Sequence, residues 1–314
     1  MVSESPAMYY EWRETLFSYS TMRVLTWNVQ GATPPQGSPD RIRDQVGFLH
    51  KTAEQPDILL LNEVTTARRE LWHDELRSIG YTQIEDTLDW ATELGESDVP
   101  PHHDINHVNG NLTAVHESFE SEGLERHQPS IRAGTYDGAD LKDWSTNFSE
   151  KILVTTVETP QSPLELWNVR AVPRNGWGEE KVKILETVYE RIRKTARMPC
   201  LLAGDFNAPK AERADGTIVP WQPDDPDADP DRWRAAETNL LSGLKSEGMV
   251  DVFRDQHGYG DVPVVDTSHR TRRFDHIIAS EELTPTACRY DTDGHECSDH
   301  APLIATFDWP RITH

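Results

Sequence analysis

The chain has 314 residues, enough to bury a sizeable core in one large domain or two ordinary ones. No stretch approaches the roughly 18 apolar residues of a membrane span, and the N-terminus lacks a signal peptide's basic and apolar regions, so we predict a cytoplasmic protein. The 54 acidic residues outnumber the 31 Lys and Arg residues, and the formal net charge of -23 argues against nucleic-acid binding through a generally basic surface. We interpret this halophilic-type acidic surface as an adaptation to concentrated intracellular salt, which screens charge repulsion.

Predicted strands and helices alternate along the chain. Residues 1–20 show no clear periodicity and are predicted to form an arm before a single domain at residues 21–314. Apolar runs predict strands at residues 22–28, 56–63, 111–115, 150–158, 164–172, 200–205, 272–280 and 300–309. Helical spacing of apolar residues predicts helices at residues 38–55, 65–80, 178–196 and about 233–247. Residues 85–110 and the Pro- and Asp-rich residues 214–233 are predicted loops. This order predicts an α/β domain with one mixed sheet, or with two sheets packed between helices.

Polar side chains stand where five of these strands end or begin. They are Asn28, Glu63, Asp205 with Asn207, Asp275 with His276, and Asp299 with His300. Functional residues of α/β proteins gather at the carboxyl ends of strands, so we expect these side chains to meet at one edge. Carboxylate and amide oxygens are ligands that Mg²⁺ or Mn²⁺ prefers, and several acids in one cleft need a cation.

Five short motifs occur in one order along the chain: TWNVQG, LNEV, GDFNAP, RFDHI and SDHAP. Their order and spacing resemble those of the endonuclease/exonuclease/phosphatase superfamily, over about residues 22–308. The resemblance implies the deoxyribonuclease I-like fold, a four-layer α/β sandwich in which two mixed sheets are flanked by helices. It also implies a Mg²⁺ or Mn²⁺ ion, with Glu63 as the direct ligand and with Asn28 and Asp299 on the same side.

The resemblance implies catalytic roles for the other matched residues. Asp205 would orient or deprotonate the attacking water, and Asn207 would hold the phosphate and that water. Asp275 would pair with His300, fix the tautomer of the imidazole and favour its charged form beside the phosphate. A carboxylate base, a cation and a charged imidazole are what the hydrolysis of a phosphate ester requires.

One position departs from the family pattern. Many members carry a His or a Tyr after the central strand, whereas this chain has Arg170 in the sequence WNVRAVPRNG. Arg170, or Arg174 with Asn175, is a candidate for binding the phosphate, since a guanidinium suits oxyanions. The alternative is that Arg170 pairs with an acid at the surface.

A basic cluster in the sequence SHRTRRFDHII contains Arg270, Arg272 and Arg273, beside Asp275. In so acidic a chain, such a cluster next to the site is where a phosphate backbone could lie, and Arg273 is our candidate contact. The alternative is a set of ion pairs with neighbouring acids.

These observations predict a divalent-metal-dependent phosphoesterase that cleaves a phosphodiester by direct attack of water. A nuclease acting on DNA or RNA is the first hypothesis. The second is a phosphatase or phosphodiesterase of a small-molecule or lipid phosphoester, which the negative charge favours. The third is an inactive binding module with the same fold, for which Arg170 is the only support.

Overall fold

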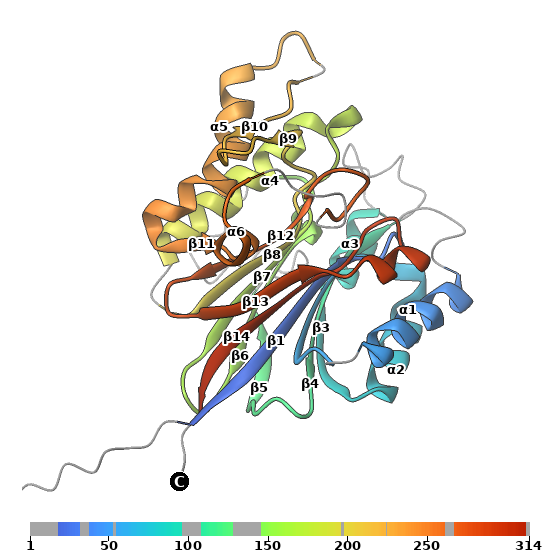
Figure 1. The fold of residues 1–314 in the computed structure, drawn as a ribbon. Helices are drawn as coiled ribbons and strands as arrows, with labels where there is room; N and C mark the ends of the chain where they lie inside the picture. Colours follow the sequence, from blue (N-terminus) through green and yellow to red (C-terminus); the bar gives the residue numbers. More distant parts are fainter. Residues whose placement is uncertain are drawn as a thin grey trace, which may run out of the picture.

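Two six-stranded mixed sheets pack face to face, and helices cover both outer sides of this pair (Figure 1). The computed structural model describes residues 18–31, 38–52, 55–95, 108–127, 146–195, 198–223, 225–260 and 267–311. The four layers are those of the deoxyribonuclease I-like sandwich, so the predicted fold class is confirmed.

The first sheet has β1 at its centre, and β1 ends at the site. Across the sheet the strands are β13 (Thr284–Tyr290), β14 (Leu303–Arg311), β1 (Ser18–Asn28), β2 (Ile58–Thr65), β4 (Asn109–His116) and β3 (Tyr81–Asp86). β1 runs parallel to β2, with Asn28 opposite Asn62, and antiparallel to β14. The carboxyl ends of β1 and β2 therefore lie at the same edge as the beginning of β14.

The second sheet repeats this arrangement around β8. Its strands are, in order, β11 (Met249–Asp251), β12 (Asp275–Ser280), β8 (Cys200–Asp205), β7 (Leu164–Val169), β6 (Ile152–Glu158) and β5 (Gly123–Arg126). β8 runs parallel to β7 and antiparallel to β12, and Asp205 pairs with Asp275 across the ladder. The last residue of β8 thus faces the first residue of β12. β6 and β7 form an antiparallel pair.

Most helices cover the outer faces of the sheets, whereas Val252 and Phe253, in the last of them, belong to the core between the sheets. The helices are α1 (Pro39–Lys51), α2 (Arg69–Ser78), α3 (Leu88–Gly95), α4 (Arg174–Thr195), α5 (Pro230–Leu241) and α6 (Val252–His257), with short 3₁₀ turns at Thr66–Arg68, Ser149–Lys151, Gly243–Glu247 and Thr292–Glu296. Helix α1 shows why such helices form: Ser38 caps it through the Arg41 amide, and Ile42, Val46 and Leu49 are buried. None of the helices in the described ranges has the length and apolar character needed to cross a membrane.

The core between the sheets follows from the alternation of side chains along each strand. Val24 and Leu60 from the first sheet meet Leu201 and Ile277 from the second, and all four are fully buried. The alternate residues face the helices, as Leu59 and Leu202 do in two further buried clusters. Burying both faces of both sheets fixes the strand register, which in turn fixes where the polar residues at the strand ends lie.

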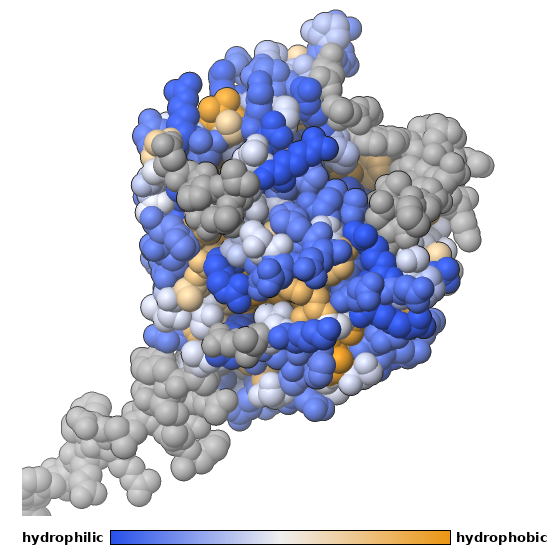
Figure 2. Space-filling model, turned by 45° about the vertical axis from the view of Figure 1, so that its right-hand side comes forward, coloured by the Kyte–Doolittle hydropathy of each residue, from blue (hydrophilic) through white to orange (hydrophobic). Residues whose placement is uncertain are grey.

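Hydrophilic side chains cover most of the face shown in Figure 2, and apolar residues are visible only in narrow areas between them. On that face, a polar surface therefore covers the apolar layers described above.

Three sequence predictions need correction. β1 begins at Ser18 and pairs with β14 from Ser18 to Thr26, so residues 18–20 belong to the sheet and not to an arm, while residues 1–17 lie outside the described residues. The predicted loop at 85–110 contains helix α3, because Leu88, Trp90 and Ala91 bury an apolar face. The predicted loop at 214–233 contains β10 (Ile218–Val219), which pairs with β9 (Ala211–Glu212) just before it, and the first turn of α5.

Candidate active site

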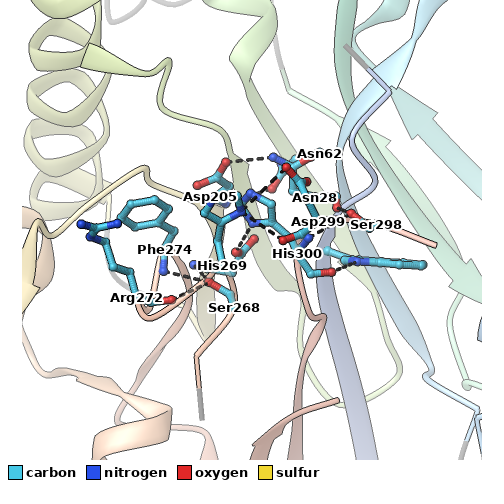
Figure 3. A network of polar contacts seen from close by, with 12 residues as sticks. Asn28, Asn62, Asp205, Ser268, His269, Arg272, Phe274, Ser298, Asp299 and His300 are labelled. Atoms are coloured by element: carbon cyan, nitrogen blue, oxygen red, sulfur yellow. Dashed lines mark hydrogen bonds and ion pairs between the residues drawn. The ribbon is translucent and has the colours of Figure 1, made fainter. Parts of the chain in front are cut away.

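The strand ends bring the predicted polar residues together at one edge of the sandwich, with the exception of His276, whose ring stacks on Phe206 and contacts the Ala208 carbonyl at 2.9 Å. Figure 3 shows Asn28, Asp205 and His300 close together, with Asn62 and Asp299 beside them. Asn28 joins three strands, because its side-chain amide donates to Glu63 Oε1 at 3.1 Å and to Asp205 Oδ2 at 2.9 Å. These contacts link β1 and β2 of the first sheet to β8 of the second.

Glu63 is turned into the site by a local irregularity of β2. The register between β2 and β4 shifts between Leu61 and Val64, and Glu63 has a φ of 59°, in the left-handed region. Left-handed backbone is strained for a glutamate, and such strain often accompanies functional positions. A sequence pattern of period two cannot reveal this bulge.

Asp205 and Asn207 form a tight turn directly after β8. Asp205 Oδ1 accepts from the Asn207 amide at 2.8 Å, and Asp205 Oδ2 accepts from the Asn207 side chain at 3.1 Å. The Asn207 side chain also donates to the Ala171 carbonyl at 2.8 Å. Gly204 is required before this turn, because its φ is 137° and a Cβ there would lie 1.9 Å from the Val169 carbonyl oxygen. Burial, reinforced by the charge of Asp275, raises the pKa of Asp205 to about 6 against the opposing charge of His300.

His300 and Asp275 form a buried pair at the same edge. His300 Nδ1 donates to Asp275 Oδ2 at 2.6 Å, which leaves Nε2 of the ring as the second titratable nitrogen. Burial alone would lower the pKa of His300, but the Asp275 carboxylate outweighs it and raises this pKa to about 10. The ring is therefore an imidazolium at neutral pH. The Trp27 indole holds the peptide of this residue by donating to the His300 carbonyl at 2.8 Å.

Sequence reasoning missed a set of buried amides beneath these residues. Asn62 accepts from the Asp205 amide at 2.9 Å and donates to Asn168 Oδ1 at 2.7 Å and to Asn111 Oδ1 at 3.1 Å. These asparagines stand within apolar strands and are fully buried, and they bridge the two sheets. The sequence did contain one signal for this set, which is an asparagine within an otherwise apolar strand. A buried amide at such a position needs hydrogen-bond partners.

Arg170 lies in the site and pairs with Glu63. The Arg170 guanidinium contacts Glu63 Oε1, and both side chains are about nine-tenths buried. The prediction of a partner acid at the surface is wrong, because Glu63 is a buried acid of the site. Burial would raise the pKa of Glu63, but Arg170, the Asn28 amide and His300 together lower it. Burial also lowers the pKa of the nearby Lys151 to about 8.

The other predicted phosphate contacts are placed differently. Arg273 is buried, pairs with Asp251 at 2.7 Å and with Glu212 at 2.9 Å, and lines a cavity of about 300 Å³. The expected contact of Arg273 with a phosphate is therefore wrong, because both carboxylates occupy its guanidinium. Arg174 lies over the Trp221 ring, 4.7 Å from its centroid. The side chain of Asn175 lies outside the described residues.

The residues present suit a divalent cation. Potential ligand atoms lie within 4.8 Å of one another in each of two groups, Asp205 with Asp275 and His300, and His269 with Asp299 and His300. Their carboxylates can bind a cation, whereas the charged ring of His300 cannot. Asp275 Oδ1 is buried and has no hydrogen-bond partner among the described residues, so a carboxylate oxygen remains for a cation or a water molecule. Oxygen donors of this kind match Mg²⁺ or Mn²⁺. The Asp299 carboxylate is exposed and lies 3.8 Å from His269 Nδ1.

We expect Arg170→Gln to strengthen the binding of Mn²⁺ about tenfold, because the variant removes a cation that competes for Glu63. Calorimetric titration of the metal-free protein with Mn²⁺ would measure this without any substrate. Arg126→Gln is a suitable control, because it breaks an ion pair with Asp89 outside the site. Equal Mn²⁺ affinities for wild type and Arg170→Gln would show that the Arg170–Glu63 pair does not oppose the metal.

A buried ion pair supports Asn207 from below. Lys181 Nζ donates to Glu237 Oε1 at 2.6 Å and to the Asn207 carbonyl at 2.9 Å, and both charged side chains are about 1% exposed. Asn207 has a φ of 49°, which asparagine tolerates better than most residues, and the Lys181 contact holds its carbonyl in place. The pair therefore contributes to the shape of the site as well as to the packing of α4 and α5.

Lys181→Met is expected to lower the free energy of unfolding by about 3–5 kcal/mol, because Glu237 would remain buried without its counterion. Urea denaturation at neutral pH measures this. The double variant Lys181→Met/Glu237→Leu should recover part of the loss, since it buries no lone charge. A double variant less stable than Lys181→Met would contradict this explanation.

Comparison with known proteins agrees with this architecture. The sequence model of the Endonuclease/Exonuclease/phosphatase family matches residues 25–300, so the chain belongs to this family. Members of the family hydrolyse phosphodiester and phosphate ester bonds. No curated protein matches the sequence significantly.

Several solved structures share the fold at low sequence identity. D. rerio TDP2 complexed with a single-strand DNA product is 17% identical, with a TM-score of 0.59, over 92% of this chain and 100% of that one. A variant of the 3' phosphatase NExo from Neisseria, bound to a product DNA hairpin, is 19% identical, with a TM-score of 0.58, over 92% and 100%. The human Nocturnin catalytic domain with bound sulfate is 16% identical, with a TM-score of 0.55, over 93% and 96%.

Proposed function

We propose that the protein is a Mg²⁺- or Mn²⁺-dependent hydrolase of phosphodiester bonds in nucleic acid. The observation that carries this proposal is the meeting of Asp205, Asn207 and the His300–Asp275 pair at one edge, joined through Asn28 to Glu63. The DNA complexes of TDP2 and NExo, which share the fold, support nucleic acid as the substrate class.

The roles follow from charge and hydrogen bonding. Asp205 accepts the proton of the attacking water, because a buried carboxylate with a pKa of about 6 is ionised at neutral pH and is still basic enough to act. Asn207 orients the same water and a phosphoryl oxygen. The His300 imidazolium donates to a phosphoryl oxygen through Nε2 and stabilises the charge that develops there.

Glu63 and Asn28 would hold the metal, with Asp299 nearby. When bound, the ion supplies positive charge to the phosphate oxygens and lowers the barrier to P–O cleavage. Arg170 lies against Glu63, so its guanidinium adds a fixed positive charge on the same side of the site. The water oxygen forms the new bond to phosphorus, and the leaving oxygen takes its proton from solvent.

A hydrolysis panel tests this function. Purified protein would be given single- and double-stranded DNA, DNA with an abasic site, RNA, inositol phosphates, a sphingomyelin-type lipid and bis(p-nitrophenyl) phosphate. Each reaction would contain Mg²⁺, Mn²⁺ or EDTA, in low salt and in molar KCl. Cleavage of DNA or RNA that EDTA abolishes would support the proposal, and the salt series would test the interpretation of the acidic surface.

Turnover of only an inositol phosphate or the lipid would replace nucleic acid by a small phosphoester as the substrate. If folded protein hydrolyses none of these substrates, the result would favour an inactive binding module. The panel therefore separates all three hypotheses.

A further inference from the structure

Arg272 differs from its neighbour Arg273 in what surrounds it. Its guanidinium lies 5.3 Å from the centroid of the Trp221 ring and 5.9 Å from that of Phe274, and its Nε donates to the Lys210 carbonyl at 3.0 Å. Two aromatic rings and a carbonyl therefore fix the plane of this side chain. Cation–π contact of this kind holds an arginine in place without neutralising it.

Within the part of the chain that the structure describes, Arg272 forms no ion pair and its two Nη groups have no hydrogen-bond partner. Most other arginines of the described residues pair with a carboxylate, as do Arg43, Arg69, Arg126, Arg170, Arg193, Arg232, Arg234, Arg254, Arg273 and Arg289. In a chain with a net charge of -23, an immobilised arginine without an acidic partner stands out as a place for an anion.

Two routes of contact join Arg272 to the catalytic residues. Through Phe274, the rings of His269 and His300 follow at 5.9 Å and then 4.6 Å between centroids. Figure 3 shows Arg272 and Phe274 on one side of His269, with His300 on the other. Through Trp221, the indole Nε1 donates to the Asn207 carbonyl at 3.1 Å. Arg272 thus lies beside the catalytic edge, outside the catalytic pairs.

The Trp221 ring also carries the guanidinium of Arg174, at 4.7 Å from its centroid. Two cationic groups therefore share one ring, and that ring is anchored to Asn207. Trp221 lies in the segment that the sequence pattern assigned to a solvated loop. Because this ring is fixed beside Asn207, the segment contributes a residue to the surroundings of the site.

We propose that Arg272, held by Trp221 and Phe274, binds a second phosphate of the substrate, next to the phosphate that is cleaved. The planar fork of an arginine suits two oxygens of one phosphate. This inference rests on the proposed function and deepens it: the preferred substrate carries at least two neighbouring phosphates, as a nucleic-acid strand does. A substrate with one phosphate has no group to place at Arg272.

The test compares Arg272→Ala with wild type on two substrates: a short single-stranded DNA oligonucleotide, and bis(p-nitrophenyl) phosphate, which has one phosphate. For the oligonucleotide we expect KM to rise about tenfold, kcat to stay within about twofold, and the slope of log kcat/KM against log salt to fall by about 1. For bis(p-nitrophenyl) phosphate we expect no change. Arg234→Ala is the control, since it removes the same charge from the exposed surface of α5.

The outcomes separate this inference from the proposed function. Loss of activity on both substrates in Asp205→Ala, together with a loss confined to the oligonucleotide in Arg272→Ala, supports both. An equal loss on both substrates in Arg272→Ala, or no loss on either, overturns the second phosphate contact while hydrolysis stands. Wild-type protein that cleaves only the single-phosphate substrate also overturns it. Arg272→Lys keeps the positive charge but lacks the planar guanidinium. Compared with Arg272→Ala, it should restore the wild-type salt slope and bring KM only part of the way back to the wild-type value.

Discussion

Asp205→Asn is expected to lower kcat on the preferred phosphodiester by about 10²–10⁴-fold, because the asparagine cannot accept the proton of the attacking water. Wild-type activity should rise with pH through a midpoint of about 6, the pKa to which burial brings this carboxyl. Below that midpoint Asp205 is protonated and cannot act as the base. Stopped assays from pH 5 to 9 at saturating Mg²⁺ would measure both effects.

The control for this variant is Asp74→Asn, which makes the same change on the exposed surface of α2 and should leave kcat unchanged. Thermal unfolding checks that Asp205→Asn still folds, since Asn28 and Asn207 lose the carboxylate oxygen that both of them contact. A folded Asp205→Asn protein with a rate within tenfold of wild type would contradict the role of Asp205 as the base.

The fold could be predicted because its signals are local and repeated. Apolar strands that end in polar residues and alternate with amphipathic helices predict a layered α/β fold. The five ordered motifs indicate which strand ends lie together at one edge. The same motifs named Asn28, Glu63, Asp205 and His300, which the structure places together. Most of the motif residues that were predicted to be functional therefore lie at this edge of the sandwich.

The remaining parts depend on contacts between residues distant in sequence. The Asn62–Asn168 contact spans 106 residues and two sheets, and no local pattern encodes it. Arg272 and Arg273 are adjacent, yet one lies against Trp221 and the other is buried with Asp251 and Glu212. Only the packing around each guanidinium decides which one is free of a carboxylate partner, and the sequence does not show that Arg273 is the paired one.

Asp275→Asn is expected to lower activity at pH 8 by about 10²-fold, because it removes the carboxylate that keeps His300 charged and oriented. In wild type the pKa of His300 is about 10, so the imidazolium is retained throughout the neutral range. Without Asp275, burial lowers that pKa, and only the charges of Asp205 and Asp299 still raise it, so the ring loses its proton at a lower pH than in wild type. The alkaline limb of the rate profile should therefore move down by several pH units.

The same pair has a consequence for stability that does not depend on substrate. A histidine whose pKa is raised by folding contributes stability that is complete below its unfolded pKa of about 6.5 and is lost as the pH rises through the folded value. Wild-type protein should therefore lose stability between pH 6.5 and about 10, and Asp275→Asn should lack this dependence. Urea midpoints across that range, with NMR titration of the His300 ring, would measure it. A His300 that titrates near 6.5 in wild type would show that the pair does not hold the proton, and the charged-imidazole role would fail with it.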